Sequence, residues 1–117
     1  MTAPTPPVRL AVLASGGGSN LQAIMDHLDA LGEGRAAQVV LVASNRAGAG
    51  ALDRARARHI PADIIADPAD GPALVRLLDA HRVDLIALAG YLKLVPSEVT
   101  ARWRGRIVNI HPALLPT

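Results

Sequence analysis

Short apolar runs alternate with segments of helical periodicity along most of the chain, and this alternation constrains the fold more than any other feature. The apolar runs predict β-strands at residues 8–14, 38–43, 62–66, 84–89 and 106–110. The segments between them predict helices at residues 20–31, 49–59, 72–81 and 96–103, and the third of these begins with a proline. Strands that alternate with helices imply βαβ units with right-handed crossovers. We therefore expect a doubly wound α/β domain whose sheet is mostly parallel and has about five strands.

Composition supports a folded domain and argues against several functional classes. Hydrophobic residues make up 50% of the chain and are almost all aliphatic, which suits a core of parallel strands. The formal charge is only +2 and aromatic residues make up 2%, so a nucleic-acid interface is not favoured. We interpret the arginines within residues 54–58 and 102–106 as solvated faces. The lack of cysteine excludes disulfides and thiolate metal sites and is compatible with the cytosol.

No segment of the sequence is typical of a signal peptide or of a membrane span. The longest apolar run, residues 85–95, is interrupted by Lys93 and is too short to cross a bilayer. Residues 1–7 are rich in proline and predict a flexible tail, and residues 8–117 read as one domain. We therefore expect a cytoplasmic protein with no membrane partner.

Polar and glycine-rich segments follow four of the predicted strands, each at the point where the strand ends. They are residues 15–20, 44–46, 90–93 and 109–111. The carboxyl ends of parallel strands lie at one edge of the sheet, which is where open α/β sheets bind ligands. The sequence therefore predicts a single site built from these segments.

The segment from Ser15 to Asn20 contains three consecutive glycines between a strand and a helix. Glycines allow the backbone to approach an anion closely, and Ser19 and Asn20 can cap the following helix while offering side-chain donors. The segment lacks the Lys-Ser/Thr of a Walker loop, and Leu21 stands where a dinucleotide fingerprint has its third glycine. We predict that Gly17, Gly18, Ser19 and Asn20 bind the phosphate of a small metabolite; the alternative is a tight structural turn.

The segment Gly90–Val95 could line a slot for a flat heterocycle, because apolar side chains flank a glycine there. The alternative is a plain connection between a strand and a helix, and the residues alone favour that alternative.

Asn109 and His111 lie two residues apart at the end of the last predicted strand. In an extended segment such residues project to the same face, so an amide donor and a titratable imidazole point at one place. Carbonyl-transfer chemistry requires that combination, because one group stabilises an oxyanion and the other moves a proton. Catalysis and a structural role are about equally favoured by this spacing. No second histidine or carboxylate stands at metal-ligand spacing from His111.

Taken together, these segments resemble the glycinamide ribonucleotide formyltransferases of purine synthesis, and the resemblance runs from Val8 to Pro116. It rests on residues 15–24, 44–45, 88–93 and 109–116. The last of these segments is shared with methionyl-tRNA formyltransferase and formyltetrahydrofolate hydrolase, whereas the glycine-serine-asparagine loop favours the glycinamide ribonucleotide branch.

The resemblance implies a Rossmann-like fold and transfer of a formyl group from 10-formyltetrahydrofolate, as cosubstrate, to the amine of glycinamide ribonucleotide. The glycine loop would hold the phosphate. Leu92, Lys93, Leu94 and Val95 would bind the folate heterocycle through their backbone. Asn109 would contact the formyl group and stabilise the oxyanion, and His111 would be the protonated acid. No metal is implied. The alternatives are another formyl-folate enzyme and an inactive phosphate-binding module.

Two departures from the family pattern affect what is expected of this chain. Gly71 stands where family members usually have an arginine near the start of the third helix. The family also continues beyond the position of Thr117, with further strands and an aspartate that raises the pKa of the histidine. We therefore expect the sequence to represent the N-terminal part of the formyltransferase domain, and the chain alone to be inactive or weak.

Overall fold

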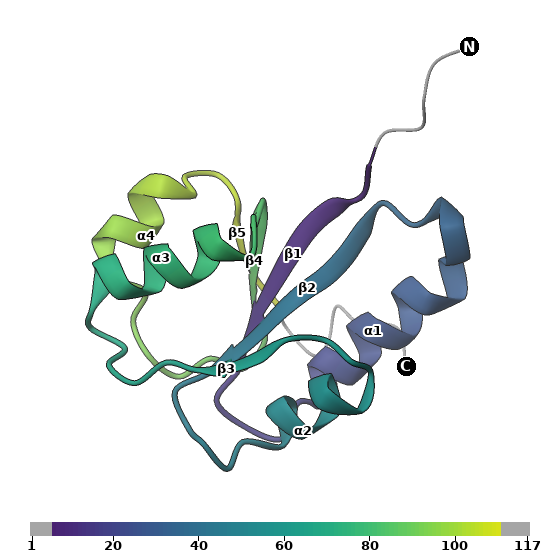
Figure 1. The fold of residues 1–117 in the computed structure, drawn as a ribbon, viewed down its shortest axis with the longest axis horizontal. Helices are drawn as coiled ribbons and strands as arrows, with labels where there is room; N and C mark the ends of the chain where they lie inside the picture. The colour runs from purple at the N-terminus through teal and green to yellow at the C-terminus, as the bar shows by residue number, and fades with distance from the viewer. Residues whose placement is uncertain (1–5, 111–117) are drawn as a thin grey trace.

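The computed structural model describes residues 6–110, apart from the side chain of Glu33, and contains one five-stranded sheet between two layers of helices (Figure 1). The strands are β1 (Val8–Leu13), β2 (Ala37–Ser44), β3 (Ala62–Ile64), β4 (Leu85–Leu88) and β5 (Ile107–Asn109). The helices are α1 (Ser19–Leu31), α2 (Gly50–Ala57), α3 (Gly71–Ala80) and α4 (Ser97–Arg102), with a short 3-10 helix, η1 (Gly32–Gly34), after α1. Every predicted strand and helix is confirmed, although η1 was not predicted. Residues 1–5 of the predicted tail lie outside the described residues.

The strand order is β3-β2-β1-β4-β5, and every pair of neighbours is parallel. The chain therefore moves outward from β1 in one direction through β2 and β3, and then crosses back to add β4 and β5 on the other side. The order reverses at β1, which makes the carboxyl ends of β1 and β4 the topological switch point of the sheet. The predicted doubly wound fold is confirmed, and the sheet is parallel throughout.

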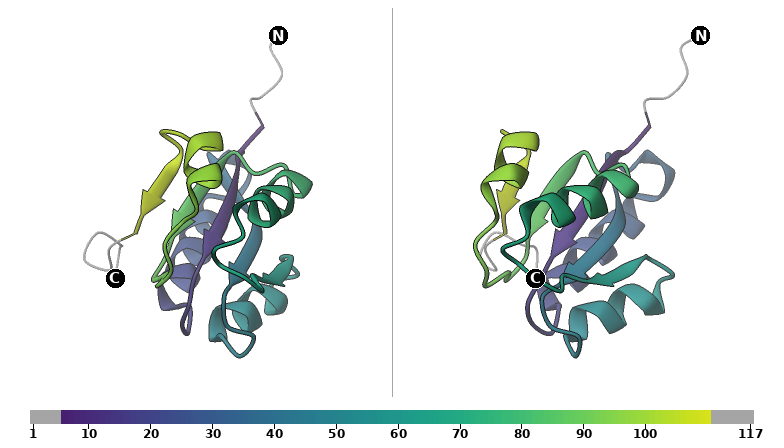
Figure 2. Two further views of the ribbon diagram at one scale, coloured as in Figure 1. Left: turned by 90° about the vertical axis from the view of Figure 1, so that its left-hand side faces the viewer. Right: turned by 60° about the vertical axis from the view of Figure 1, so that its left-hand side comes forward.

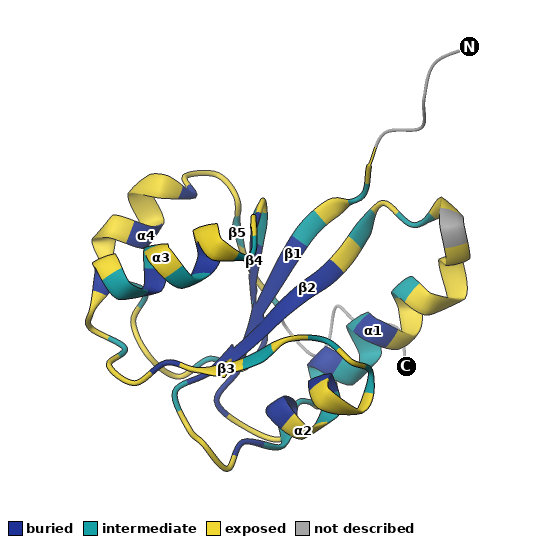
Figure 3. Cartoon of the chain, in the orientation of Figure 1, coloured by how far each residue is buried: buried dark blue, intermediate teal, exposed yellow. Residues whose placement is uncertain are grey.

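Helices cover both faces of the sheet, α1 and α2 on one side and α3 and α4 on the other (Figure 2). Successive side chains of β1 alternate between these faces, as the pleat requires. Leu10 and Val12 pack with α1 and α2, whereas Ala11 and Leu13 pack with α3 and α4. The central strands are therefore buried on both sides along most of their length (Figure 3), which accounts for their continuous apolar sequence.

Helices α3 and α4 are fixed at their ends by specific hydrogen bonds. The Asp70 carboxylate caps α3 by accepting from the backbone N–H of Ala73 at 3.0 Å, next to the proline in the first turn. The indole of Trp103, which is fully buried after α4, donates to the carbonyl of Val83 at 2.9 Å. The layer over this face is thereby tied to the segment leading into β4.

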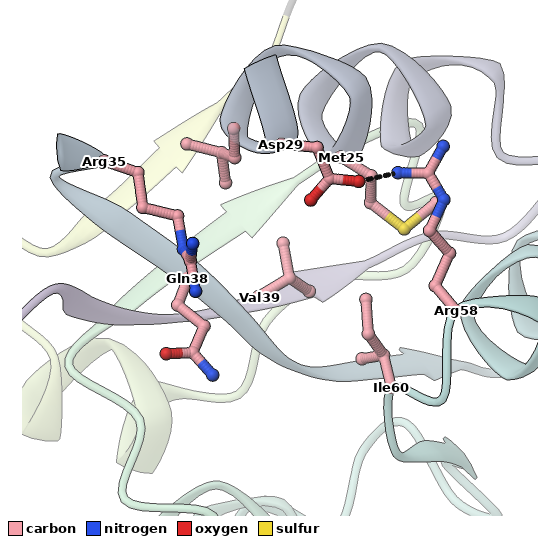
Figure 4. A pocket seen from close by; sticks show the side chains of 8 residues that line it. Met25, Asp29, Arg35, Gln38, Val39, Arg58 and Ile60 are labelled. Carbon is pink, nitrogen blue, oxygen red and sulfur yellow. Dashed lines mark hydrogen bonds and ion pairs between the residues drawn. The ribbon is translucent and has the colours of Figure 1, made fainter. Parts of the chain in front are cut away.

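Helices α1 and α2 are joined by Arg58, which follows α2 and forms ion pairs with Asp26 and Asp29 of α1. Figure 4 shows the pair with Asp29. The hydrogen bond from Arg58, followed by one from Gln22, holds the pKa of the Asp26 carboxyl below its ordinary value. Arg58 belongs to the arginines interpreted as a solvated face, and it forms these pairs at the surface, with 31% of its side chain exposed. None of the helices in the described part of the chain has the length and hydropathy required of a membrane span.

The Asp26 carboxyl predicts a pH dependence of stability. Its pKa is lower in the folded protein than the ordinary 3.8, so its contribution is complete above that pH and is lost as the pH falls through the folded pKa. We expect Asp26→Asn to lower the melting temperature slightly at neutral pH. The difference from the wild type should shrink below pH 3.8. Thermal unfolding followed by circular dichroism across pH 2 to 7 measures this.

Asp53→Asn is the matched control, because Asp53 is 80% exposed and pairs with Arg56 at 3.5 Å on a single helix. It should change the melting temperature less than Asp26→Asn at neutral pH. Equal effects of the two substitutions would contradict a role for the Asp26 pair in joining the helices.

Tyr91 carries an unpaired polar atom into the core. Its ring packs in the cluster beneath α3 and α4, and its hydroxyl is buried with no hydrogen-bond partner among the described residues. Burial raises the pKa of this hydroxyl. An unpaired buried hydroxyl costs about 1–3 kcal/mol. We expect Tyr91→Phe to raise the free energy of unfolding by about 1 kcal/mol in urea denaturation.

Trp103→Phe is the contrasting variant, because it removes a buried donor that is satisfied and leaves the Val83 carbonyl unpaired. It should lower stability by about 2 kcal/mol or more. A loss of stability in Tyr91→Phe would show that the tyrosine hydroxyl is satisfied in solution.

Candidate functional site

The segments that follow β1, β2 and β4 meet at the carboxyl edge of the sheet, as predicted. Ser15, the second residue after β1, links them: its hydroxyl donates to the Asn45 side chain at 2.7 Å and accepts from the backbone N–H of Leu92 at 2.9 Å. Its own N–H donates to the Gly90 carbonyl at 3.2 Å. Sequence reasoning placed these residues in the site segments but missed the contacts, because nothing local in the sequence pairs Ser15 with a residue 30 positions away.

The glycine loop leads into α1 through Gly18, which is the N-cap residue and has φ of +84°. The prediction that Ser19 and Asn20 cap this helix was wrong, since the helix begins at Ser19 and, among the described residues, no side chain caps it. Ser19 and Asn20 instead occupy the first turn, where Ser19 is exposed and Asn20 is half-buried. This first turn contains no acidic residue, so the positive end of the helix dipole is not neutralised by its own sequence.

Close contact with α2 explains why the loop needs glycine at Gly18. A Cβ at Gly18 would lie 2.7 Å from the Ala51 Cα, and one at Gly50 would lie 2.9 Å from the Gly17 carbonyl oxygen. In contrast, a Cβ at Gly16 or at Gly17 would meet nothing within 4 Å. One side of the loop is therefore packed against α2, and the other side is open to a ligand.

Arg54 of α2 adds a positive charge beside this loop. Its Nε donates to the Gly17 carbonyl at 2.7 Å, and its Nη1 donates to the Gln22 side chain at 3.2 Å. Arg54 also belongs to the arginines interpreted as a solvated face, and its bond to Gly17 lies at the surface. The two bonds hold the guanidinium next to the first turn of α1, where it strengthens the attraction for an anion.

The segment predicted to bind a heterocycle borders a cleft of about 710 Å³. Residues 92–98 line one side of the cleft, and residues 67–69, between β3 and α3, line the other. Leu92 and Leu94 are 80% and 93% exposed, whereas Tyr91 and Val95 pack against the core. The segment is thus anchored in the protein at its two ends, by Tyr91 and Val95, and presents the leucines between them outward. Such exposed leucines beside a cleft are suited to contact with an apolar ligand.

Gly71, at the start of α3, faces α4. The carboxylate of Glu98 occupies the space beside it, since a Cβ at Gly71 would lie 2.2 Å from Glu98 Oε1. Glu98 also borders the cleft. At Gly71, where an arginine was expected from the family pattern, the space for a side chain is therefore occupied by the acidic Glu98.

Asn109 ends β5 and is exposed at the same edge of the sheet. It is paired in register with Leu88, and the N–H of Ile110 donates to the Leu88 carbonyl at 2.9 Å. Asn109 therefore lies next to the strand end that leads into Gly90 and the cleft segment. His111 lies outside the described residues. Within residues 6–110, no group of three histidine, aspartate or glutamate side chains is arranged to hold a metal ion.

A second pocket, of about 260 Å³, lies over the α1 and α2 face of the sheet (Figure 4). Gln38 and Val39, which line it, belong to the first half of β2, so it is away from the carboxyl edge. None of the predicted site residues lines it. Two arginines line it: Arg58 is paired with Asp26 and Asp29, and Arg35 donates to the Gly32 carbonyl at 3.0 Å. We therefore assign the site to the carboxyl edge.

Comparison with known proteins shows the family of this chain. The family model described as formyl transferase matches residues 8–117. The chain belongs to the formyl transferase family. It is 46% identical to the trifunctional purine biosynthetic protein adenosine-3 of Drosophila melanogaster over 92% of its own length. It is 41% identical to the chloroplastic phosphoribosylglycinamide formyltransferase of Arabidopsis thaliana, also over 92% of its length. Glycinamide ribonucleotide transformylase 1 from Geobacillus kaustophilus superposes with a TM-score of 0.82 at 37% identity, over 96% of the chain.

The family members compared are longer than this chain. It spans 8% of the Drosophila protein, 39% of the Arabidopsis protein and 62% of the Geobacillus chain. The matched part includes all five strands described above, and so includes the glycine loop, the cleft segment and Asn109.

The contact between the glycine loop and α2 predicts unequal effects of two alanine substitutions. Gly18→Ala places a side chain on a left-handed residue and against the Ala51 backbone. It should lower the free energy of unfolding by about 2 kcal/mol or more. Gly16 lies two residues earlier in the loop, where a Cβ would meet nothing within 4 Å. Gly16→Ala should therefore change the free energy of unfolding by less than about 1 kcal/mol. Urea denaturation of the two variants measures the difference, and equal losses would contradict the packed arrangement of the loop.

Proposed function

We propose that the carboxyl edge of this sheet binds glycinamide ribonucleotide and 10-formyltetrahydrofolate for transfer of the formyl group between them. The observation that carries the proposal is the juxtaposition of two binding elements at one switch point. An uncapped helix start with a glycine loop lies on one side of Ser15, and a cleft with exposed leucines lies on the other. The names and similarity of the Arabidopsis and Geobacillus proteins support the same substrates.

The phosphate of the ribonucleotide binds at the first turn of α1. Backbone N–H groups there point out of the helix, and the side chains of Ser19 and Asn20 add donors. Gly17 and Gly18 shape the loop so that the phosphate approaches the backbone, and Arg54 contributes its charge from the α2 side. The predicted role of Gly17, Gly18, Ser19 and Asn20 thus fits the open side of the loop.

The folate heterocycle binds along Leu92, Lys93, Leu94 and Val95 in the adjoining cleft. Its flat ring covers the exposed leucines, and its polar edge bonds to the backbone of the segment. The formyl group then lies near the end of β5, within the region that Asn109 faces. The proposal requires no metal.

In the reaction, the primary amine of the ribonucleotide attacks the formyl carbon and forms a new C–N bond, and the carbonyl oxygen becomes an oxyanion. The Asn109 amide donates to that oxygen and stabilises the tetrahedral intermediate. The intermediate collapses when the bond to the folate nitrogen breaks. His111, as the protonated acid, gives its proton to the departing folate nitrogen. The neutral imidazole then accepts the proton that the attacking amine loses, which restores the acid.

The phosphate assignment is tested by calorimetric titration with glycinamide ribonucleotide and with its dephosphorylated riboside. The wild type should bind the phosphorylated ligand more tightly. The double variant Ser19→Ala/Asn20→Ala should weaken that binding by about tenfold or more, because charge-assisted hydrogen bonds contribute about 1.5–3 kcal/mol each.

The riboside is the control ligand, and the double variant should bind it as the wild type does. Thr100→Ala, which removes an exposed hydroxyl from α4 outside the cleft, should leave binding of both ligands unchanged. Equal affinity of the wild type for ligands with and without phosphate would show that the loop does not hold a phosphate.

A further inference from the structure

We propose that Ser15 is a positioning residue for the cleft segment: its hydroxyl fixes the backbone of Leu92 and so sets where a folate ring binds. This inference rests on the proposed function for its ligand, but its geometry stands independently. Ser15 is buried and touches no ligand in the proposed site, so it acts on the ligand only through the segment that it holds.

The hydrogen-bonding capacity of Ser15 is divided between two loops. Its hydroxyl hydrogen goes to Asn45 Oδ1 at 2.7 Å, and its oxygen accepts the Leu92 N–H at 2.9 Å. The two strands that precede these loops, β2 and β4, flank β1 on opposite sides. A single hydroxyl group therefore connects the segments on both sides of the central strand.

Burial makes these bonds strong determinants of position. Ser15 is 1% exposed, so water does not readily replace the hydroxyl if it is removed. Alanine at this position would leave the Leu92 N–H and the Asn45 oxygen without their partner. The chain could satisfy them only by moving the loop toward solvent.

The cleft segment has few other contacts that would fix its beginning. Gly90 reverses the chain with φ of +73°, and Leu92 is 80% exposed, so the Leu92 side chain contributes little packing. Besides the packing of the Tyr91 side chain against the core, two hydrogen bonds anchor the chain at this point: the bond from Ser15 N to the Gly90 carbonyl and the bond from Leu92 N to the Ser15 hydroxyl. Both involve Ser15, and only the second depends on its side chain.

Ser44 provides a matched control at the end of the neighbouring strand. It is also a serine, it is fully buried, and its hydroxyl accepts a backbone N–H, that of Arg46, at 3.1 Å. Ser44→Ala therefore removes the same group from the same edge of the sheet without touching the Leu92 segment. Asn45→Ala serves as a second variant, because it removes the partner of the Ser15 hydroxyl and leaves the hydroxyl in place.

The experiment combines amide hydrogen exchange with ligand titration. In Ser15→Ala, exchange of the Leu92 amide should accelerate by about tenfold, while the Ile86 amide of β4 stays protected. The dissociation constant for 5-formyltetrahydrofolate, used as a stable folate probe, should rise about fivefold. That for glycinamide ribonucleotide should change by less than about twofold. Ser44→Ala should leave the Leu92 amide protected, and Asn45→Ala should accelerate its exchange to a smaller extent.

Each outcome decides a separate point. Unchanged protection of Leu92 in Ser15→Ala would overturn the positioning role. Lost protection with unchanged affinity for the folate probe would overturn its importance for binding, and an equal loss of affinity for both ligands would point to general destabilisation. If the wild type binds no folate probe, the proposed function fails, and the exchange data alone decide whether Ser15 holds the segment.

Discussion

The hydrogen bonding of β1 along both of its edges is the constraint on which the rest of the structure depends. Its pairing with β2 and with β4 brings three strand ends, distant in sequence, to one place. Because the strands are parallel, the segments that follow them all emerge at the same edge. Ser15, the second residue after β1, lies where these segments meet and still bonds to both sides. The hydrogen bonding of the sheet therefore continues into the site, and the spacing of the strands sets the spacing of the loops that form it.

The fold could be predicted from sequence because its pattern is local. Buried parallel strands require continuous apolar residues, and the helices between them carry one apolar face, so the period changes at each boundary. The errors lie where tertiary contacts decide. The N-cap of α1 is Gly18 and not a serine or asparagine, because the backbone there is left-handed and a side chain would meet the Ala51 backbone of α2. The arginines within residues 54–58 were interpreted as a solvated face. Their long-range partners could not be foreseen: Arg54 bonds to a residue 37 positions away, and Arg58 bonds to one 32 positions away.

The candidate site could likewise be predicted from the sequence only in part. The glycine loop, the segment after β4 and Asn109 were predicted from their positions at strand ends, and topology brings the first two together. What could not be predicted is how they are held. The Ser15–Asn45 bond depends on the register of β1 against β2, which pairs Leu13 with Ala43. No property of either residue alone reveals it. Contacts between loops, such as this one, follow from the register of the two strands that precede them. The sequence of either strand alone does not determine that register.

The exposed leucines of the cleft segment can contribute to binding because the backbone that carries them is held in place. Side chains as exposed as Leu92 and Leu94 do not stabilise the free protein, since their apolar area remains in water. A ligand that buried both would gain about 1.5–3 kcal/mol for each side chain. That gain is retained only if the segment is already ordered, because ordering it on binding would cost about 1–2 kcal/mol for each residue fixed. The bonds from Ser15 order the start of the segment before any ligand arrives. A buried serine and two exposed leucines are thus two parts of one arrangement, in which the serine preserves the binding energy that the leucines supply.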